Sequence, residues 1–187
     1  MNTILQQELK KILNGRFSQS ESTRLNYSRG EDTYDPILSK AVVFPETNEE
    51  VSKILKLCNE HKVPVVPFGT GTTLEGNVVG NDKGITISLE KMNKILTVNT
   101  QDFDCRVQAC VTREQLNDYL REDGVFFPID PGANAAIGGM ASTSASGTMA
   151  VKYGTMKTVI TGLTVVLPNG EIMNTGGRTK KTSAGYI

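Results

Sequence analysis

Two stretches of the sequence combine glycine with small hydroxyl residues and could bind a diphosphate. The first, which we call the first loop (67–76), begins Pro67-Phe68-Gly69-Thr70-Gly71-Thr72-Thr73. Gly69 and Gly71 allow successive backbone N–H groups to converge on one anion, and the threonine hydroxyls add donors without adding charge. The diphosphate of a dinucleotide needs several such donors at once. The first loop therefore predicts a neutral anion-binding site.

Two better-known phosphate motifs do not fit the first loop. A G-x-G-x-x-G fingerprint needs a third glycine where Leu74 stands. Gly71 and Gly76 have the spacing of a P-loop, but Asn77 occupies the position of its lysine. A plain surface loop remains the alternative for an isolated pair of glycines.

A second stretch, the second loop (130–154), makes that alternative less attractive. It has almost no large side chains, so backbone can lie flat against a ligand, and 142–144 supply hydroxyls. We expect a helix to begin at Ile137 and to aim its first N–H groups at the same phosphates. A flexible linker is the competing interpretation, but linkers seldom place residues such as Met140 and Met149 in an alanine-rich helical pattern.

Hydrophobic periodicity and capping signals predict the elements that position the two loops. We expect a helix over 3–13 closed by Gly15, an extended surface segment over 20–40 and a strand over 41–44. A helix would then run from the capping box Thr47–Glu50 to His61, and another from the capping box Thr112–Gln115 to Arg121. Strands are expected over 63–66, 85–89, 95–98 and 105–111, and a hairpin would join 159–167 to 171–174 around Asn169-Gly170.

These elements predict an α+β fold with two lobes. A small N-terminal α/β lobe would end near residue 80, and a larger lobe would hold a mixed or antiparallel sheet with flanking helices. The two loops would lie at the seam between the lobes. Residues 1–40 would form an N-terminal helix and extended segment, and residues 41–187 the main domain.

The composition excludes some classes of partner. Among 187 residues, Lys and Arg number 20, as do Asp and Glu. No net charge attracts the chain to nucleic acid, so we expect no such partner. No apolar run approaches the roughly 18 residues that span a bilayer, and the start of the chain lacks the pattern of a signal peptide. We expect a cytoplasmic protein, with peripheral membrane or organellar association left open.

The cysteines do not form a metal motif. Cys58 and His61 make a single C-x-x-H without a second pair, so we expect no zinc site. The apolar neighbours of Cys58 and the alternating residues around Cys105 instead predict small buried thiols. We expect His61 to stand at a helix end, where the helix dipole favours it.

Together the loops resemble the FAD-binding (PCMH-type) domain of the vanillyl-alcohol-oxidase and p-cresol-methylhydroxylase superfamily. Within it, the order and spacing of the motifs are most similar to the branch of D-lactate dehydrogenase and the glycolate oxidase D-subunit. The similarity extends over about 42–186 and rests on five segments: Pro67–Thr73, Asp130–Ala133, Ile137–Gly139, Ser144–Gly147 and Tyr153–Thr155.

The resemblance implies roles around a bound FAD. Residues 69–73 would wrap the diphosphate, 130–136 would run beside the ribityl and diphosphate groups, and 137–139 would complete the cradle. Tyr153-Gly154 would close the second loop, and the strand 159–166 would border the adenine. The expected cofactor-binding residues are Pro67, Phe68, Gly69, Thr70, Gly71, Thr72, Thr73, Asp130, Pro131, Gly132, Ala133, Ala136, Ile137, Gly138, Gly139, Thr143, Ser144, Gly147, Tyr153 and Gly154.

Members of this superfamily often attach flavin covalently through a histidine in the first loop. Thr72 and Thr73 occupy that neighbourhood here, and the single histidine, His61, lies upstream. The sequence therefore predicts that FAD is bound without a covalent link.

The resemblance further implies an oxidoreductase that oxidises a D-2-hydroxy acid, such as D-lactate or glycolate, by hydride transfer to flavin N5. In the family, a later cap domain supplies basic residues for the substrate carboxylate and a histidine for the hydroxyl proton. The chain ends before such a region, so we expect an N-terminal fragment with no catalytic residues and no turnover alone.

Two alternatives remain open. In the first, a second polypeptide completes the fold of an FAD-binding module. In the second, the chain belongs to a related flavoenzyme, similar to UDP-N-acetylenolpyruvoylglucosamine reductase or to alkyl-glycerone-phosphate synthase. The two loops do not separate these alternatives from a hydroxy-acid oxidoreductase.

Overall fold

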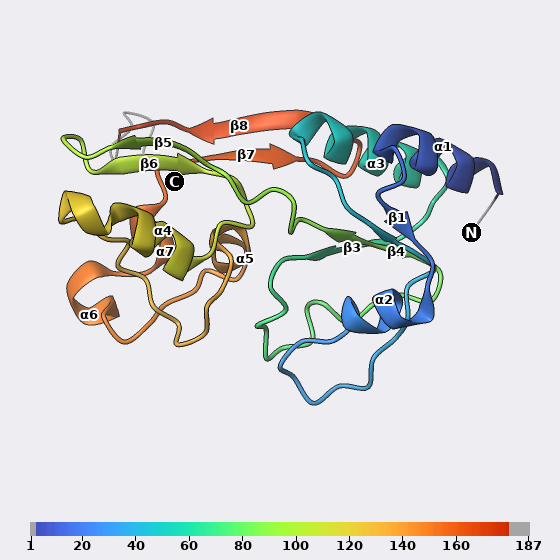
Figure 1. The fold of residues 1–187 in the computed structure, drawn as a ribbon, viewed down its shortest axis with the longest axis horizontal. Coiled ribbons are helices and arrows are strands. Elements are labelled where there is room, and N and C mark those ends of the chain that lie inside the picture. Colours follow the sequence, from blue (N-terminus) through green and yellow to red (C-terminus); the bar gives the residue numbers. More distant parts are fainter. Residues whose placement is uncertain (1–2, 180–187) are drawn as a thin grey trace. The chain divides into compact units, whose positions relative to one another are not determined.

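A computed structural model describes residues 3–179 and divides the chain into two compact units. The first unit runs to Met92 and includes Val166–Glu171, and the second holds Asn93–Val165 and the chain from Ile172 (Figure 1). The sequence placed the division near residue 80. The chain stays in the first unit beyond that point because its next strand pairs inside the first sheet.

The first unit is built on a four-stranded mixed sheet. Its order is β1 (Phe17–Ser18), β2 (Val42–Val43), β4 (Ile85–Ser88) and β3 (Val65–Phe68). β4 is parallel to both β2 and β3, whereas β1 pairs antiparallel with β2. A mixed sheet was predicted for the larger lobe, but this one lies in the first unit and includes the strand expected over 85–89. Pro64 stands just before β3, where its missing N–H costs no ladder hydrogen bond.

Three helices flank this sheet. α1 (Thr3–Leu13) and α3 (Asn48–Glu60) pack together on one side of it, and α2 (Glu21–Asn26) lies on the other (Figure 1). The core between α1, α3 and the strands contains these fully buried side chains: Leu5, Leu9, Leu13, Ala41, Val43, Ile54, Cys58, Ile85 and Ile87.

The centre of the sheet is more buried than its sequence pattern indicates. Ile85-Thr86-Ile87-Ser88 alternates between apolar and polar residues, which is typical of a strand with one wet face. All four residues of β4 are nevertheless buried. Thr86 remains satisfied because its hydroxyl donates to Ser39 Oγ at 2.9 Å. A central parallel strand is covered on both faces, whatever its own alternation.

The predicted helix ends are confirmed for α1 and α3. The Thr47 hydroxyl accepts a hydrogen bond from the Glu50 N–H at 3.2 Å, and His61 is the C-cap of α3. The prediction of an extended segment over 20–40 is wrong at its start, where Ser20 caps α2. A six-residue helix shows too little periodicity to be recognised, so only its cap signalled it.

The second unit combines two antiparallel strand pairs with short helices. β5 (Ile95–Asn99) pairs with β6 (Asp104–Val107), and β7 (Gly162–Val166) pairs with β8 (Ile172–Gly176). The helices are α4 (Arg113–Leu120), continued by a 3-10 turn over Arg121–Asp123, then α5 (Ile137–Ser142), α6 (Ala150–Tyr153) and α7 (Met156–Val159).

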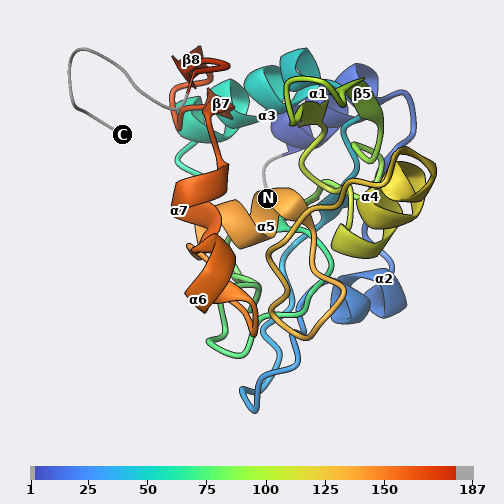
Figure 2. The ribbon, with the colours of Figure 1, turned by 90° about the vertical axis from the view of Figure 1, so that its left-hand side faces the viewer.

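Two small cores hold the second unit together. One joins Val111 to Leu116 and Leu120 of α4, and the other joins Ile129 to Met140 of α5 and Met156 of α7. α5 contacts α7, which lies close to it in Figure 2, and α6 directly precedes α7 in the chain. The capping box at Thr112 is confirmed, because its hydroxyl accepts from the Gln115 N–H at 3.2 Å. α7 replaces the start of the strand expected from residue 159.

The hairpin of β7 and β8 has a different turn from the one predicted. Its Asn-Gly signal is typical of a two-residue turn with positive φ at both positions. Only Gly170 has positive φ, at +87°, and its N–H donates to Leu167 O at 2.8 Å. This is a three-residue loop in which Pro168 and Asn169 form the turn and Gly170 the bulge. The Gly170 carbonyl accepts from Ser52 Oγ of α3 at 2.5 Å.

None of the three cysteines forms a disulfide within residues 3–179, and their environments differ. Cys58 is buried, as predicted, and so is Cys110, but the prediction of a buried Cys105 is wrong, because this residue of β6 is exposed. Burial raises the pKa of the Cys58 thiol to about 12, so the thiol stays neutral at physiological pH.

Within residues 3–179, no helix is both long and apolar enough to cross a bilayer.

An ion pair fixes the start of α3 to the chain before the sheet. Arg16 donates to both carboxylate oxygens of Glu50, at 2.7 and 2.5 Å, and to the Phe44 carbonyl at 2.9 Å. Glu50 also accepts from the Glu46 N–H at 2.8 Å, so it does not complete the predicted capping box at Thr47. The hydrogen bonds from Arg16 hold the pKa of the Glu50 carboxyl below its ordinary value.

We expect Glu50→Gln to lower the free energy of unfolding by about 1–2 kcal/mol at pH 7, the range for a hydrogen-bonded, partly buried charge. The folded pKa of Glu50 is depressed, so this stability is present above the unfolded pKa of about 4.3 and is lost as pH falls through the folded value. Urea unfolding at pH 7 measures the stability lost in the variant, and urea unfolding at pH 3 measures how much of that difference disappears at low pH. Glu49→Gln, at an exposed position of the same turn, is the control. Equal destabilisation by the two variants at pH 7 would contradict the expectation.

Candidate functional site

The first loop begins at the carboxyl end of β3 and turns over an aromatic base. Phe68, the last residue of β3, is buried, and the Tyr27 ring packs edge-on against Phe68 and Phe44 with centroids 5.1 and 5.3 Å apart. Gly71 has φ +75°, and a Cβ there would lie 2.9 Å from the Phe68 ring. Glycine at 71 is therefore required both by the backbone conformation and by the close approach of the ring.

The polar groups of the first loop carry no charge from Pro67 to Leu74. Thr70 Oγ1 and Thr72 Oγ1 lie 3.4 Å apart, so two hydroxyls converge on one side of the loop. The Thr73 hydroxyl accepts from the Glu75 N–H at 3.3 Å, which holds the end of the turn. Converging neutral donors are the arrangement that an oxyanion requires, and Lys or Arg is not needed for it.

The second loop is closed by Asp130. Its carboxylate accepts from the Gly132 N–H at 3.0 Å, and its carbonyl accepts from the Thr148 N–H at 3.3 Å. Gly147 lies directly against the Asp130 backbone, where no Cβ would fit. Arg113 of α4 approaches the same carboxylate, with its Nε 3.5 Å from Oδ1. Asp130 thus joins both ends of the loop to α4.

The start of α5 differs from the expected anion site. Ile137 donates its N–H to Val111 O and Gly138 donates to Ala109 O, both at 2.8 Å. A Cβ at 138 would lie 2.7 Å from the Ala109 Cβ, so glycine there serves close packing between segments of the second unit. The expectation that these two N–H groups face phosphates is wrong, because they are occupied by carbonyls. Gly139 is exposed, with open space around its Cβ position.

The remaining predicted residues have more local contacts. The Thr143 hydroxyl donates to Gly139 O at 3.1 Å, and Ser144 has φ +51°. The Tyr153 ring packs edge-on against Phe126 at 5.6 Å, and Gly154 has φ +81° beside Thr158. Of the others, Pro131 and Gly132 are exposed, Ala133 is half-buried and Ala136 is buried. The first loop belongs to the first unit and the second loop to the second.

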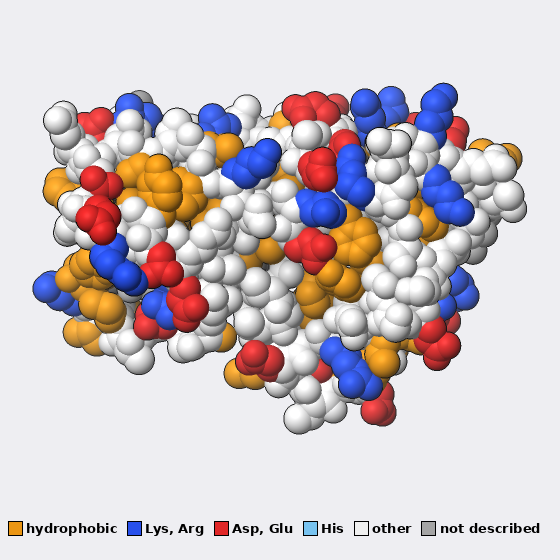
Figure 3. Space-filling model, viewed as in Figure 1, with side chains coloured by type: hydrophobic (Ala, Val, Ile, Leu, Met, Phe, Trp, Pro, Cys, Tyr) orange, Lys and Arg blue, Asp and Glu red, His pale blue; other side chains and the backbone are white. Residues whose placement is uncertain are grey.

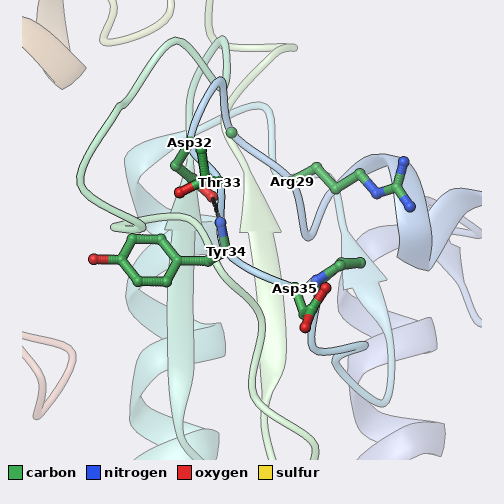
Figure 4. Close-up of a pocket in the computed structure, with 7 residues that line it drawn as sticks. Arg29, Asp32, Thr33, Tyr34 and Asp35 are labelled. Carbon is green, nitrogen blue, oxygen red and sulfur yellow. Dashed lines mark hydrogen bonds between the residues drawn. The ribbon is translucent and has the colours of Figure 1, made fainter.

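Sequence reasoning missed a segment that lies against the first loop. Residues 29–36 were expected to be an extended surface stretch, but they line a pocket of about 350 Å³ (Figure 4). Glu31 donates its N–H to Thr73 O at 3.1 Å, and Tyr34 lies against Gly76. Gly30 within a charged run was the available signal, because glycine often marks a close backbone approach.

Hydrophobic side chains remain exposed on the second unit (Figure 3). Leu96, Tyr119 and Phe126 are each about half exposed, at 49, 59 and 49%. Exposed large hydrophobic side chains are one feature of surfaces that pack against further protein. Among residues 3–179, no group of three or more His, Cys, Asp or Glu is placed to hold a metal ion.

Curated relatives share the sequence over most of this chain. A probable mitochondrial D-lactate dehydrogenase of Danio rerio is 46% identical over 172 residues, which cover 90% of this chain and 35% of the relative. The glycolate oxidase subunit GlcD of Bacillus subtilis (strain 168) is 35% identical over 172 residues, covering 91% and 37%. The chain spans about a third of the length of the curated relatives it matches.

Solved structures share the fold. The chain aligns with p-cresol methylhydroxylase with substrate bound at a TM-score of 0.79 and 25% identity, covering 92% of this chain and 35% of that one. It aligns with an alkyldihydroxyacetonephosphate synthase at a TM-score of 0.86 and 21% identity, covering 100% and 36%. These alignments confirm the predicted α+β, PCMH-type fold.

A family model described as an FAD binding domain matches residues 39–176, which include both loops and every strand from β2 to β8. The match covers most of the chain, and the fold and the curated relatives agree with it. FAD is the cofactor that this domain binds. The chain belongs to the family of PCMH-type FAD-binding domains.

Proposed function

We propose that this chain is the FAD-binding part of an oxidoreductase that oxidises a D-2-hydroxy acid of the D-lactate or glycolate type. The observation that carries the proposal is the family match over 39–176, because it contains the first loop at the end of β3, whose residues from Pro67 to Leu74 carry no charge. The D-lactate dehydrogenase and the glycolate oxidase subunit among the curated relatives support the substrate class.

The residues of the first loop fit an FAD diphosphate. Gly71 keeps the backbone in a left-handed conformation that favours glycine, and Thr70 and Thr72 present two neighbouring hydroxyls. We infer that 69–73 hold the diphosphate and that the second loop contributes further contacts along the ribityl chain. In the second loop, the exposed backbone at Gly139, with open space around its Cβ position, is better placed to meet a ligand than the occupied N–H groups of Ile137 and Gly138.

Bound FAD supplies an acceptor for the hydride that leaves the carbon bearing the substrate hydroxyl. The described residues bind and orient this cofactor and exclude water from its diphosphate. The reaction also needs a base for the hydroxyl proton. His61 caps α3 and lies in neither loop, so we assign no catalytic residue to this chain.

Two other functions stay as alternatives. A second polypeptide could complete the domain, and the exposed hydrophobic side chains of the second unit favour this more than any other observation. A related flavoenzyme, similar to alkyl-glycerone-phosphate synthase or to UDP-N-acetylenolpyruvoylglucosamine reductase, is the other alternative. The likeness to alkyldihydroxyacetonephosphate synthase is at 21% identity and supports the fold alone.

A cytoplasmic location stays a prediction, and the mitochondrial relative favours organellar association instead.

We expect the purified chain to bind FAD and Gly71→Ala to weaken that binding about tenfold, which corresponds to roughly 1.4 kcal/mol. The added methyl meets the Phe68 ring and strains the loop at φ +75°. Quenching of FAD fluorescence measures the dissociation constant. Gly124→Ala is the matched control, because its φ of +68° brings the same strain at a site with open space outside both loops.

Gly147→Ala tests the second loop in the same assay. It separates two backbones that touch at Asp130, so we expect a similar loss of FAD affinity. Unchanged affinity in Gly147→Ala would remove the second loop from the proposed site. Absence of FAD binding by the unmodified chain would count against the proposed function itself.

We expect FAD to be released when the holoprotein is denatured, because Thr72 and Thr73 stand where a covalent attachment would need histidine. Precipitation with trichloroacetic acid and absorbance at about 450 nm locate the flavin. Flavin found in the supernatant agrees with non-covalent binding. Flavin that remains with the pellet would show a covalent link and would contradict the assignment.

We expect no turnover when the chain is incubated with D-lactate or glycolate, FAD and an artificial electron acceptor dye. The chain has one histidine, and that residue ends a helix rather than joining either loop. Dye bleaching follows the reaction, and a full-length relative under the same conditions is the positive control. Steady dye reduction by this chain alone would overturn the expectation.

A further inference from the structure

A segment that precedes the family match lies against the first loop. The match begins at residue 39, whereas residues 29–34 contact the first loop at several points. We call residues 29–34 the clamp. All of its contacts lie within the first unit.

The clamp joins the loop first through backbone. The Glu31 N–H donates to the Thr73 carbonyl at 3.1 Å. A Cβ at Gly30 would lie 2.8 Å from the same carbonyl oxygen and 2.9 Å from the Thr73 methyl carbon. The two backbones are therefore too close for any side chain at residue 30, and the hydrogen bond fixes the peptide that follows Thr73.

Two further contacts flank this hydrogen bond. The carbonyl of Arg29 lies 3.4 Å from the Cβ position of Gly71, and the Tyr34 ring lies 2.8 Å from that of Gly76. The Arg29 side chain points away from Asp32 and Tyr34 (Figure 4), so its contribution to the contact is its backbone. Gly71, in the middle of the first loop, and Gly76, at its end, thus leave room for groups of the clamp.

The clamp is held in its own shape by Asp32. Its Oδ1 accepts from the Tyr34 N–H at 3.0 Å (Figure 4). Its Oδ2 is buried against Gly30 and has no hydrogen-bond partner in the described part of the chain. A buried oxygen without a hydrogen-bond partner costs free energy of folding. The other contacts of the clamp, including the close packing around Gly30, must offset that cost.

We propose that the clamp is a positioning segment of the cofactor site, which sets the geometry of 71–73 for the diphosphate. Gly30 and the N–H of Glu31 act through Thr73 and do not touch the cofactor themselves. This inference rests on the proposed function of the first loop. It extends the functional part of the chain beyond the residues that the family match includes.

Gly30→Ala tests the clamp, because the new methyl pushes the Thr73 carbonyl away. We expect at least a tenfold rise in the dissociation constants of both FAD and ADP, measured by fluorescence quenching and by calorimetry. The ADP probe reports on the diphosphate without the flavin. The melting temperature of the ligand-free chain should fall by more than that of Gly177→Ala, a control with open space at its Cβ position and no positive φ, so both ligands are titrated well below the unfolding transition of each variant.

A second pair of variants keeps the test decisive if Gly30→Ala does not fold. Glu31→Pro removes the N–H that donates to Thr73, whereas Glu31→Gln keeps it and removes only the charge. We expect Glu31→Pro to weaken FAD and ADP binding and Glu31→Gln to leave it unchanged. If the unmodified chain binds FAD and both Gly30→Ala and Glu31→Pro bind equally well, the clamp has no positioning role. If the unmodified chain does not bind FAD, the proposed function fails first.

Discussion

The parallel pairing of β3 with β4 determines where the first loop can act. Four residue pairs, from Val65 with Ile85 to Phe68 with Ser88, align the ends of the two strands. Ligands of sheets with parallel strands bind beyond the carboxyl ends of those strands, and the first loop leaves β3 at that end. A one-residue shift of the register would turn the Phe68 side chain to the opposite face of the sheet. Gly71 would then no longer lie over its ring.

Close approach between backbones is the second constraint, and it recurs in both units. Gly30 lies against Thr73, Gly138 against Ala109, and Gly147 against Asp130. In each case a peptide carbonyl or backbone atom occupies the space of a Cβ. Such contacts leave no room for a side chain, and they make the loops depend on glycine where a hydroxyl residue would not fit.

The ion pair of Arg16 with Glu50 shows how a sequence motif can be used differently from its usual pattern. Thr47 caps α3 as expected, but Glu50 turns to Arg16 and to the Glu46 N–H. The reason is that β1 brings Arg16 next to the start of α3 through its pairing with β2. No local pattern around Thr47 contains that information.

The sequence by itself determined the long helices, the caps at Thr47 and Thr112, most strands and the glycine-rich character of both loops. These features depend on periodicity and on hydrogen bonds between residues a few positions apart. Only the tertiary structure decided the complete burial of β4, the occupied N–H groups at Ile137 and Gly138, and the packing of 29–34 against the first loop. Each of these depends on a partner at least 26 residues away, such as Ala109 for Gly138 or Thr73 for Glu31, and local spacing does not encode such a partner.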